Sequence, residues 1–309
     1  MNQREVDTYD VAVVGGGAAG LSAALVLGRA RRRVVVIDAG APRNAPAAHL
    51  QGFLSRDGLP PADLLTMGRA EVTGYGVELV ADRVVRVRAG FVVGTAAGRA
   101  LEARRILIAT GVHDELPDVP GVRERWGRDL LHCPYCHGWE VRDQPLGVLG
   151  TLSGSVQHAL LVRQWSDDVV YLAHTAEPSL TEEAHLEARG IGVVRGEVAR
   201  LVVGADRLTG VELADGRLIA RSAVFIRPLN RPHADGLLSG LGCKLDEAGF
   251  ARVDATWSTS VPGVWAAGNV VDPRAQVITS AGAGSAAAIA INADLVQDDL
   301  VGALDPDRH

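Results

Sequence analysis

The strongest constraint on the fold is a glycine-rich turn close to the start of the chain. Residues 9–14 (YDVAVV) predict a buried strand, and the run Gly-Gly-Gly-Ala-Ala-Gly follows at 15–20. Residues 21–30 (LSAALVLGRA) then show the apolar spacing of a helix, and a second strand (RVVVID) ends in Asp38. Strand, G-x-G-x-x-G turn, helix, strand and acidic residue together predict a βαβ unit that binds a dinucleotide.

The glycines and the acidic residue of this pattern each have a physical role in dinucleotide binding. Gly15 permits the tight turn, Gly17 lets the backbone approach a pyrophosphate, and Gly20 lets the helix close on the strand. The helix N-terminus faces the phosphates, and Asp38 accepts hydrogen bonds from ribose hydroxyls.

Length and charge exclude several classes of protein. At 309 residues the chain is long enough for two domains. Its net charge of −6 argues against a nucleic-acid partner, which would require a basic face, and aromatic residues at 4% are too few for a stacking platform. Three cysteines cannot form a disulfide scaffold in a chain of this size.

No membrane or secretory segment is predicted. The first ten residues are charged and lead directly into a strand, and the Ala-rich segment from Ala281 is interrupted by glycine, serine, asparagine and aspartate. We therefore expect a soluble, cytoplasmic protein without a membrane partner.

Two later segments indicate which dinucleotide binds. A predicted strand ends in Ala109-Thr110-Gly111, and another ends in Ala267-Gly268-Asn269 before a Gly/Ala-rich helix. Both could be ordinary strand-to-turn signals. With the first motif, however, the sequence resembles the two-dinucleotide flavoprotein disulfide reductases, in which these segments support FAD.

The resemblance implies a set of FAD-binding residues. Asn269 stands where that family usually has Asp, so this side chain can still hydrogen-bond a ribityl hydroxyl but brings no charge. The implied FAD-binding residues are Gly15, Gly17, Ala18, Ala19, Gly20, Asp38, Ala39, Arg43, Asn44, His49, Val84, Ala109, Thr110, Gly111, Gly268, Asn269, Gln276 and Val277.

The only close cysteine pair lies in the segment His-Cys-Pro-Tyr-Cys-His-Gly at 132–138. A C-x-x-C pair alone can be half of a zinc site, a redox pair or two inert thiols. A structural zinc site needs four ligands, and no second C-x-x-C or H-x-x-x-H is present, so we expect no metal. A redox-active dithiol is favoured because a flavin in the same chain can exchange electrons with a thiolate.

The resemblance also suggests roles within this segment. In the low-molecular-weight thioredoxin reductases the second cysteine of C-x-x-C-D lies beside the flavin, which implies that Cys136 is the flavin-side thiol and Cys133 the more exposed one. His137 replaces the acidic residue of that motif and His132 is the second candidate base, because an imidazole can lower a thiol pKa or move its proton. Cys243 is expected to be a small buried hydrophobe.

A second Rossmann-like unit is present, but its nucleotide loop is altered. The strand at 146–150, helix at 155–165 and strand at 168–174 align the glycine pattern with Gly150, Leu152 and Ser155. The isobutyl group of Leu152 would stand where the backbone must approach a pyrophosphate.

Two further departures affect the same unit. The family's NADPH enzymes carry an arginine pair after the next strand, and here that stretch reads His-Thr-Ala at 174–176. Segment 225–233 (FIRPLNRPH) replaces the usual glycine-rich turn. These changes predict a degenerate NADPH site in a domain kept as a scaffold.

Loss of NADPH binding leaves a dithiol substrate as the simplest electron source. The motif C-P-Y-C-H-G and the segment 43–58 resemble the FAD-dependent dithiol oxidases of gliotoxin, holomycin and romidepsin biosynthesis. This resemblance implies an enzyme that forms an intramolecular disulfide in a small natural-product dithiol, such as an antibiotic precursor, with O2 accepting electrons as H2O2. It also implies a homodimer, and Tyr135, Trp139 and Phe53 are candidate linings of the substrate pocket.

Two alternatives remain open from the sequence. One is a protein disulfide reductase of the thioredoxin-reductase type that uses NADPH or ferredoxin. The other is a non-catalytic flavin redox sensor that signals through the state of the cysteine pair.

The fold class expected is α/β, with two Rossmann-like domains, each a three-layer ββα structure. The FAD-binding domain is predicted to be discontinuous, at 1–118 and 245–309. The inserted domain, 119–244, would carry the C-x-x-C pair and the degenerate NADPH site.

Overall fold

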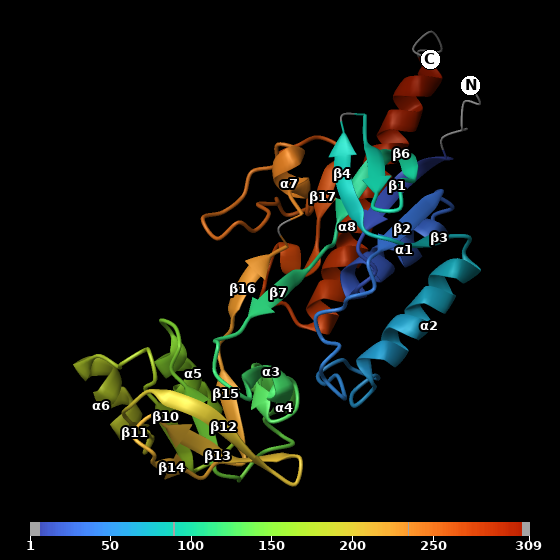
Figure 1. Ribbon diagram of the computed structural model, residues 1–309. Coiled ribbons are helices and arrows are strands. Elements are labelled where there is room, and N and C mark those ends of the chain that lie inside the picture. The colour runs from blue at the N-terminus through green and yellow to red at the C-terminus, as the bar shows by residue number, and fades with distance from the viewer. Residues whose placement is uncertain (1–6, 89, 234, 305–309) are drawn as a thin grey trace. The chain divides into compact units, whose positions relative to one another are not determined.

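The structure is a computed structural model that describes residues 7–88, 90–233 and 235–304 (Figure 1). The chain divides into two compact units, each with its own core. Unit 1 comprises the described residues of 1–43, 62–113 and 231–309, and unit 2 comprises 44–61 and 114–230.

Unit 1 is a three-layer α/β structure built on a seven-stranded sheet. The sheet order is β3-β2-β1-β6-β5-β4, with β17 also paired to β6; β3, β2, β1, β6 and β17 run parallel, and β4 and β5 are antiparallel additions. The elements are β1 (Asp7–Val14), α1 (Ala18–Arg29), β2 (Val34–Asp38), α2 (Pro61–Gly74), β3 (Glu78–Ala81), β4 (Val84–Arg88), β5 (Val92–Thr95), β6 (Ala100–Ile108), α7 (Leu237–Gly240), β17 (Val264–Ala266), the 3-10 turn η1 (Gly268–Val270) and α8 (Val277–Leu304).

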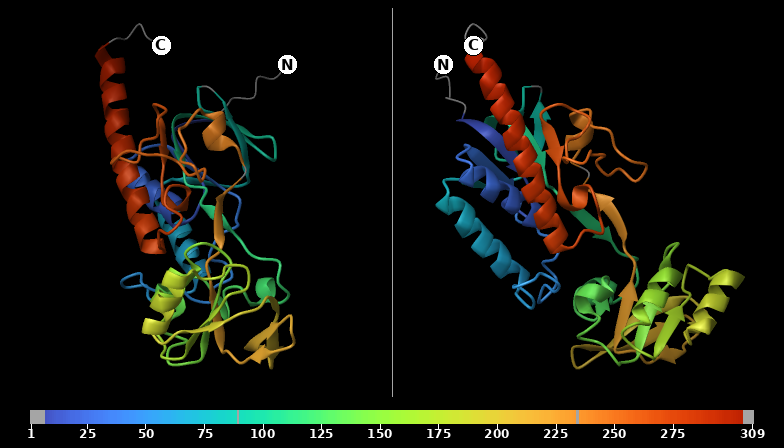
Figure 2. Two further views of the ribbon diagram at one scale, coloured as in Figure 1. Left: turned by 90° about the vertical axis from the view of Figure 1, so that its left-hand side faces the viewer. Right: turned by 180° about the vertical axis from the view of Figure 1, so that it is seen from behind.

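The two faces of this sheet bury different layers because side chains alternate along each strand. Val11 and Val13 of β1 join one core with α1, α2 and α8, whereas Ala12 and Val14 join a second core with β4, β5 and α7. Figure 2 shows α8, in red, running along the helical side of this unit. Gly284 of α8 permits a close crossing, because a Cβ there would lie 2.0 Å from the carbonyl oxygen of Ala19 on α1.

The register of unit 1 brings several strand ends to one edge. Val14 lies opposite both Ile37 and Ile108, and Ala266 also lies opposite Ile108. Because parallel strands end at the same edge, the residues that follow β1, β2, β6 and β17 are neighbours in space. This edge contains most of the residues predicted to bind FAD.

Unit 2 is a second three-layer structure. A five-stranded parallel sheet has the order β11-β10-β9-β15-β8, with α5 and α6 packed on one face and a three-stranded antiparallel sheet, β12-β13-β14, on the other. The elements are α3 (Val122–Arg125), β8 (Leu130–Leu131), α4 (Pro134–His137), β9 (Leu146–Leu149), α5 (Ser155–Val162), β10 (Val169–Leu172), α6 (Leu180–Ala188), β11 (Gly192–Val194), β12 (Val198–Gly204), β13 (Arg207–Leu213), β14 (Leu218–Ile219) and β15 (Ala223–Ile226).

The chain passes between the units through two paired strands, β7 (Val112–Glu115) and β16 (Leu229–Pro232). The compact units differ from the predicted domain boundaries in three places, the shortest of which is residues 114–118, which belong to unit 2. Residues 231–244 lie in unit 1 because α7 buries apolar side chains, including Leu237 and Leu238, in its core. Residues 44–61 belong to unit 2, where Pro46 packs closely against Gly127.

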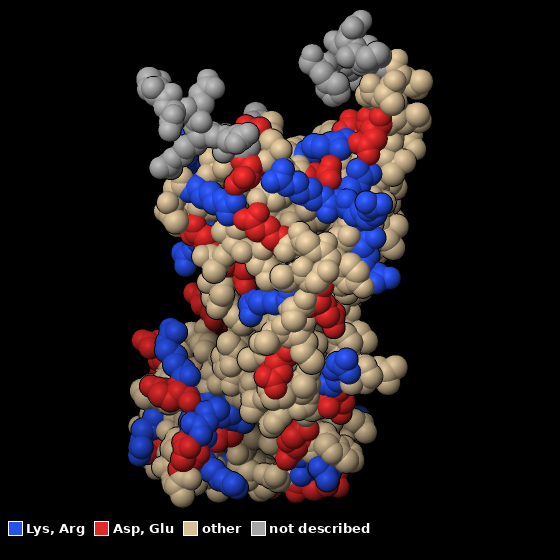
Figure 3. Space-filling view, turned by 90° about the vertical axis from the view of Figure 1, so that its right-hand side faces the viewer, with Lys and Arg blue, Asp and Glu red and all other residues tan. Residues whose placement is uncertain are grey.

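Charged side chains of both signs are interspersed on the face drawn in Figure 3. Several arginines of unit 1 are paired with acids; for example, Arg104 bonds Asp10 at 3.0 Å and Asp298 at 2.9 Å. Among the helices of residues 7–88, 90–233 and 235–304, none combines the length and apolarity needed to cross a membrane.

Candidate active site

Two glycines of the glycine-rich turn in unit 1 are closely surrounded by backbone. Gly15 has φ +108°, and a Cβ there would lie 2.4 Å from the carbonyl oxygen of Ala109. A Cβ on Gly20 would lie 1.9 Å from the carbonyl oxygen of Gly15. Both positions therefore require glycine, as the sequence pattern predicts.

Gly17 differs from these two because it is not crowded by protein. No atom lies within 4 Å of the position its Cβ would take, and no described side chain caps the first turn of α1. Open space and uncapped backbone N–H groups at a helix N-terminus are what a pyrophosphate requires. The turn therefore fits a dinucleotide.

Asp38 lies at the end of β2, next to this turn. A Cβ on Gly16 would lie 2.8 Å from the carboxyl carbon of Asp38, so the Asp38 carboxylate faces the glycine-rich backbone. Arg69 on α2 donates to Asp38 Oδ2 at 3.1 Å. The sequence analysis missed Arg69 because only the packing of α2 brings it to β2.

Asn269 follows β17, and its hydrogen bonds explain why an amide stands at this position in place of the usual Asp. Its Nδ2 donates to the carbonyl oxygens of Asp272 and Ala275, each at 2.9 Å. A carboxylate could not make these two bonds, because it has no hydrogens to donate. The amide thus fixes the loop before α8 and keeps its oxygen as an acceptor.

Most of the predicted FAD-binding residues lie in unit 1, but not all. Arg43 also lies there and donates to the carbonyl oxygen of Pro273 at 2.8 Å, whereas Val84 is buried at the start of β4. Asn44 and His49 belong to unit 2. The predicted residues that unit 1 contains are Gly15, Gly17, Ala18, Ala19, Gly20, Asp38, Ala39, Arg43, Val84, Ala109, Thr110, Gly111, Gly268, Asn269, Gln276 and Val277.

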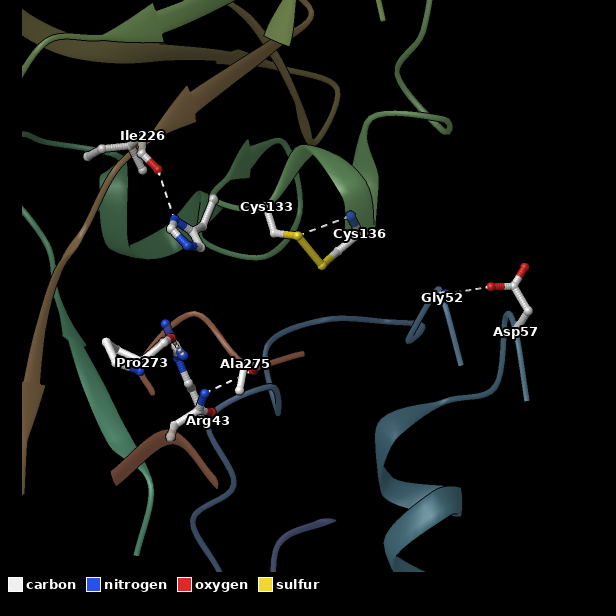
Figure 4. Close-up of a disulfide and its surroundings, with 10 residues drawn as sticks. Arg43, Gly52, Asp57, Cys133, Cys136, Ile226, Pro273 and Ala275 are labelled. Carbon is white, nitrogen blue, oxygen red and sulfur yellow. Dashed lines mark hydrogen bonds between the residues drawn. A yellow bond between two sulfur atoms is a disulfide. The ribbon is translucent and has the colours of Figure 1, made fainter. Parts of the chain in front are cut away.

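The cysteine pair of unit 2 forms a disulfide. Cys133 and Cys136 are bonded, with their Cα atoms 5.2 Å apart, and both are half-buried. Cys133 is the N-cap of α4 and Pro134 occupies the first turn, so the cysteines are separated by one helical turn. The backbone N–H of Cys136 donates to Cys133 Sγ at 3.2 Å (Figure 4). Such a bond favours the thiolate of Cys133 once the pair is reduced.

The predicted candidate bases lie on either side of this pair. Burial lowers the pKa of His137 below its usual 6.5, and the nearby charge of Glu140 opposes that shift only in part. His137 is therefore neutral near pH 7 and can accept a proton. His132 Nδ1 lies 3.3 Å from the carbonyl oxygen of Ile226.

His158 on α5 was missed by the sequence analysis. Its ring centroid lies 6.1 Å from that of His132. Burial, with smaller contributions from His132 and Arg227, lowers the pKa of His158 to about 4. Among the described residues its Nε2 has no hydrogen-bond partner. A lone histidine on a helix gives no signal in the sequence, and only the packing of α5 on the parallel sheet places it here.

The second nucleotide-type loop, between β9 and α5, is closed by its own side chains. Ser155 Oγ accepts from the backbone N–H groups of Thr151 at 3.4 Å and Leu152 at 3.2 Å. Arg227 Nη1 would be 2.0 Å from a Cβ on Gly154, so the guanidinium lies directly over the start of the helix. The loop therefore does not present its amides as the first turn does.

A cavity of about 610 Å³ lies at this end of the unit 2 sheet. Its lining includes three carboxylates, Glu115, Asp118 and Glu197, against a single arginine, Arg227. His174 also lines it and accepts the N–H of Val198 at 3.0 Å. Three carboxylates against one arginine make this lining unfavourable for the 2′-phosphate of NADPH, because like charges repel it.

The sequence predicts no metal at the segment that contains Cys133 and Cys136. Within residues 7–88, 90–233 and 235–304, no group of three His, Cys, Asp or Glu side chains is placed to hold a metal ion. The third cysteine, Cys243, is buried in unit 1, and burial raises the pKa of its thiol. It behaves as the buried small residue that the sequence predicts.

Comparison with known proteins identifies the family. Residues 9–287 match the pyridine nucleotide-disulphide oxidoreductase family. The crystal structure of HlmI is 57% identical, with a TM-score of 0.93, covering 98% of this chain and 96% of that one. A thioredoxin reductase, sirT, from Leptosphaeria maculans is 32% identical over 94% of this chain and 96% of its own length. A thioredoxin reductase, tcpT, from Claviceps purpurea is 30% identical over 84% and 86%.

The chain thus belongs to the pyridine nucleotide-disulphide oxidoreductase family. Within that family it is a thioredoxin-reductase-like, FAD-dependent dithiol oxidase similar to HlmI. The open turn at Gly17 and the acceptor side chains of Asp38 and Asn269, all in unit 1, fit FAD.

Proposed function

We propose that this dithiol oxidase closes an intramolecular disulfide in a small natural-product dithiol and that O2 accepts the electrons. The overall reaction is balanced: the dithiol loses two electrons and two protons, and O2 gains them to become H2O2. The observation that carries the proposal is the contrast between the Cys133–Cys136 disulfide, ready to receive electrons, and the β9–α5 loop, whose amides Ser155 already occupies.

The first half of the reaction is thiol–disulfide exchange. A substrate thiolate attacks Cys133 Sγ, the bond to Cys136 breaks, and Cys136 leaves as a thiolate. The second substrate thiolate then attacks the substrate sulfur of the mixed disulfide, which releases the cyclic disulfide and the thiolate of Cys133. The N–H of Cys136 stabilises that thiolate, since it already donates to Cys133 Sγ at 3.2 Å.

The protons of the two substrate thiols need an acceptor. His137 is the candidate because burial keeps it neutral, and His132 is the second candidate because it precedes Cys133 directly. FAD, held in unit 1 by the turn at Gly17 with Asp38 and Asn269, would supply the two-electron acceptor through which the electrons of the cysteine thiolates reach O2.

A thioredoxin-reductase activity is the second candidate, because the curated relatives sirT and tcpT carry that name. It needs NADPH or ferredoxin as the electron source. The closed loop and the acidic cavity lining disfavour NADPH. The two candidates therefore differ in which donor reduces the flavin.

The test is an anaerobic titration of the flavin absorbance of the holoenzyme. We expect a small dithiol to bleach the flavin, NADPH to leave it oxidised on the same time scale, and admitted air to restore the colour with one H2O2 per disulfide formed. Rapid bleaching by NADPH would instead support the reductase.

Cysteine variants give the matched control. Cys133→Ser and Cys136→Ser should retain FAD and lose turnover, whereas Cys243→Ala removes a thiol from the core of unit 1 and should retain turnover. Full turnover in either of the first two variants would exclude the exchange mechanism.

We also propose that unit 1 holds the FAD and that the enzyme acts as a cytoplasmic homodimer. Support for a dimer comes from α8, which exposes apolar side chains at Ile289, Val296 and Leu300, spaced seven and four residues apart and therefore on one face of the helix. Light scattering of the holoenzyme should give twice the chain mass, and a monomer at micromolar concentration would contradict the dimer.

A further inference from the structure

We propose that Tyr135 and Trp139 form an aromatic platform that recognises the ring system of the dithiol substrate. The inference rests on the proposed function, because it assigns a binding role to side chains beside the Cys133–Cys136 disulfide. It commits to one ligand class: a small dithiol whose two thiols are attached to a flat, apolar or aromatic ring.

Both side chains are unusually exposed for their type. Tyr135 has 63% of its surface accessible and Trp139 has 66%. Large aromatic rings are normally packed against protein, so two exposed rings in one short segment indicate a binding surface. Tyr135 lies between the two cysteines in the chain, and Trp139 follows α4 by two residues.

Tyr135 is held in a fixed orientation. Its ring meets that of Trp165 edge to face, with centroids 5.5 Å apart and planes at 89°. Trp165 can lie there because residue 138 is glycine: a Cβ at that position would be 2.7 Å from Trp165 Cγ. The tyrosine is thus braced from within unit 2 while most of its surface stays accessible.

Trp139 is held by a different contact. The guanidinium of Arg142 lies 4.0 Å from the centroid of its ring, and the same side chain donates to the carbonyl oxygen of Trp139 at 2.6 Å. This cation–π contact orders the ring before any ligand arrives, which lowers the entropy cost of binding.

Two charged side chains that follow Trp139 in the chain, Glu140 and Arg142, are already engaged. Glu140 accepts a hydrogen bond from Gln51 at 3.2 Å, and Arg142 is occupied by Trp139. The exposed rings of Tyr135 and Trp139 therefore offer mainly aromatic carbon to a ligand. Such a surface favours stacking of a flat ring and offers little to an acyclic polar dithiol.

The experiment compares two dithiols that close rings of the same size. Dithiothreitol and 1,2-benzenedimethanethiol both form six-membered cyclic disulfides, but only the second carries a fused aromatic ring. For holoenzyme and variants, kcat/KM is measured with each by oxygen consumption, and the ratio of the two values is the readout.

We expect Trp139→Ala and Tyr135→Ala each to lower the ratio of aryl to acyclic dithiol roughly tenfold, through KM. Tyr135→Phe, which keeps the ring, should retain the ratio. The control Leu218→Ala removes another exposed apolar side chain of unit 2, on β14, and should leave the ratio unchanged. An unaltered ratio in both alanine variants would overturn the platform.

The outcomes separate this inference from the function on which it rests. If the unmodified holoenzyme oxidises neither dithiol, the proposed function fails. If it oxidises both and the alanine variants lower the two kcat/KM values equally, the rings act on the disulfide and not on the substrate ring, and the recognition role fails alone.

Discussion

The β1–α1 loop of unit 1 and the β9–α5 loop of unit 2 have the same topology, but their backbone N–H groups differ in accessibility. In unit 1 the turn after β1 leaves Gly17 with no neighbouring atom within 4 Å of a Cβ position. In unit 2 the turn after β9 uses Ser155 Oγ to accept two of its own amides, and Arg227 covers Gly154. A Rossmann-like strand–turn–helix therefore becomes a phosphate site only when its backbone N–H groups remain available.

The difference shows how a nucleotide site can be lost without loss of the fold. The sheet of unit 2 keeps its parallel register, and its core is as continuous as that of unit 1. Packing of β-branched and aliphatic side chains decides the fold, whereas a few side chains at the strand ends decide the ligand. The predictions below test this separation.

The largest effect is expected for Gly17→Val. The backbone of Gly17, with φ −80° and ψ −170°, is compatible with a β-branched residue, so the chain should fold, but the side chain would fill the space of the pyrophosphate. We expect FAD affinity to fall at least roughly a hundredfold, on the order of 3 kcal/mol. Flavin absorbance per polypeptide after purification measures this loss.

A control for that variant is Gly74→Val, at the end of α2, where an added Cβ also meets no atom within 4 Å. It should retain full flavin occupancy. Normal FAD content in Gly17→Val would contradict the assignment of the open turn to the cofactor.

The next effect concerns the closed loop. In the unmodified protein we expect NADPH to bleach the flavin at least roughly a hundredfold more slowly than a small dithiol, because an anion would have to displace the internal bonds of Ser155. The triple variant Leu152→Gly, Ser155→Ala, Arg227→Ala frees the amides. It should bind NADPH more tightly than the unmodified protein by calorimetry, and equal binding would show that the closed loop is not the barrier.

A smaller effect is expected at Asp38. Asp38→Asn keeps the shape but removes a charge-assisted acceptor, so FAD affinity should fall roughly tenfold. Arg69→Ala removes only the half-exposed partner of Asp38 and should change the affinity by less than about fivefold, by analogy with a surface ion pair, roughly 0–1 kcal/mol. A larger loss in Arg69→Ala than in Asp38→Asn would place the cofactor contact on the arginine.

The smallest effect is a shift in pH dependence. Burial lowers the pKa of His137, so the neutral base persists below pH 6.5 and the acidic limb of flavin reduction by a dithiol should have its midpoint below that value. Glu140 raises the same pKa, so Glu140→Gln should move the midpoint lower still. Stopped-flow bleaching between pH 5 and 8 measures both; a midpoint above 6.5 would assign the proton to another group.

Much of this protein could be predicted from short segments of sequence. The strands predicted at 9–14 and 146–150, the turn at 15–20 and the cysteine pair all depend on neighbours in the chain. The structure has the two strands at Asp7–Val14 and Leu146–Leu149, and the turn and the cysteine pair where the sequence predicts them. The boundaries of the compact units could not be predicted, because the placement of 44–61 and 231–244 depends on which core their apolar side chains join.

The α/β class, the dinucleotide turn and the redox pair follow from short segments, because glycine geometry and C-x-x-C spacing are local properties. The packed fold was needed to show that Arg227 covers the second loop, that Asn269 donates to two carbonyl oxygens, and that His158 lies beside His132. Arg227 and His158 act across strand ends or helix packing, and Asn269 depends on the fold of the loop it closes. The side-chain directions that create such contacts exist only after the cores have packed.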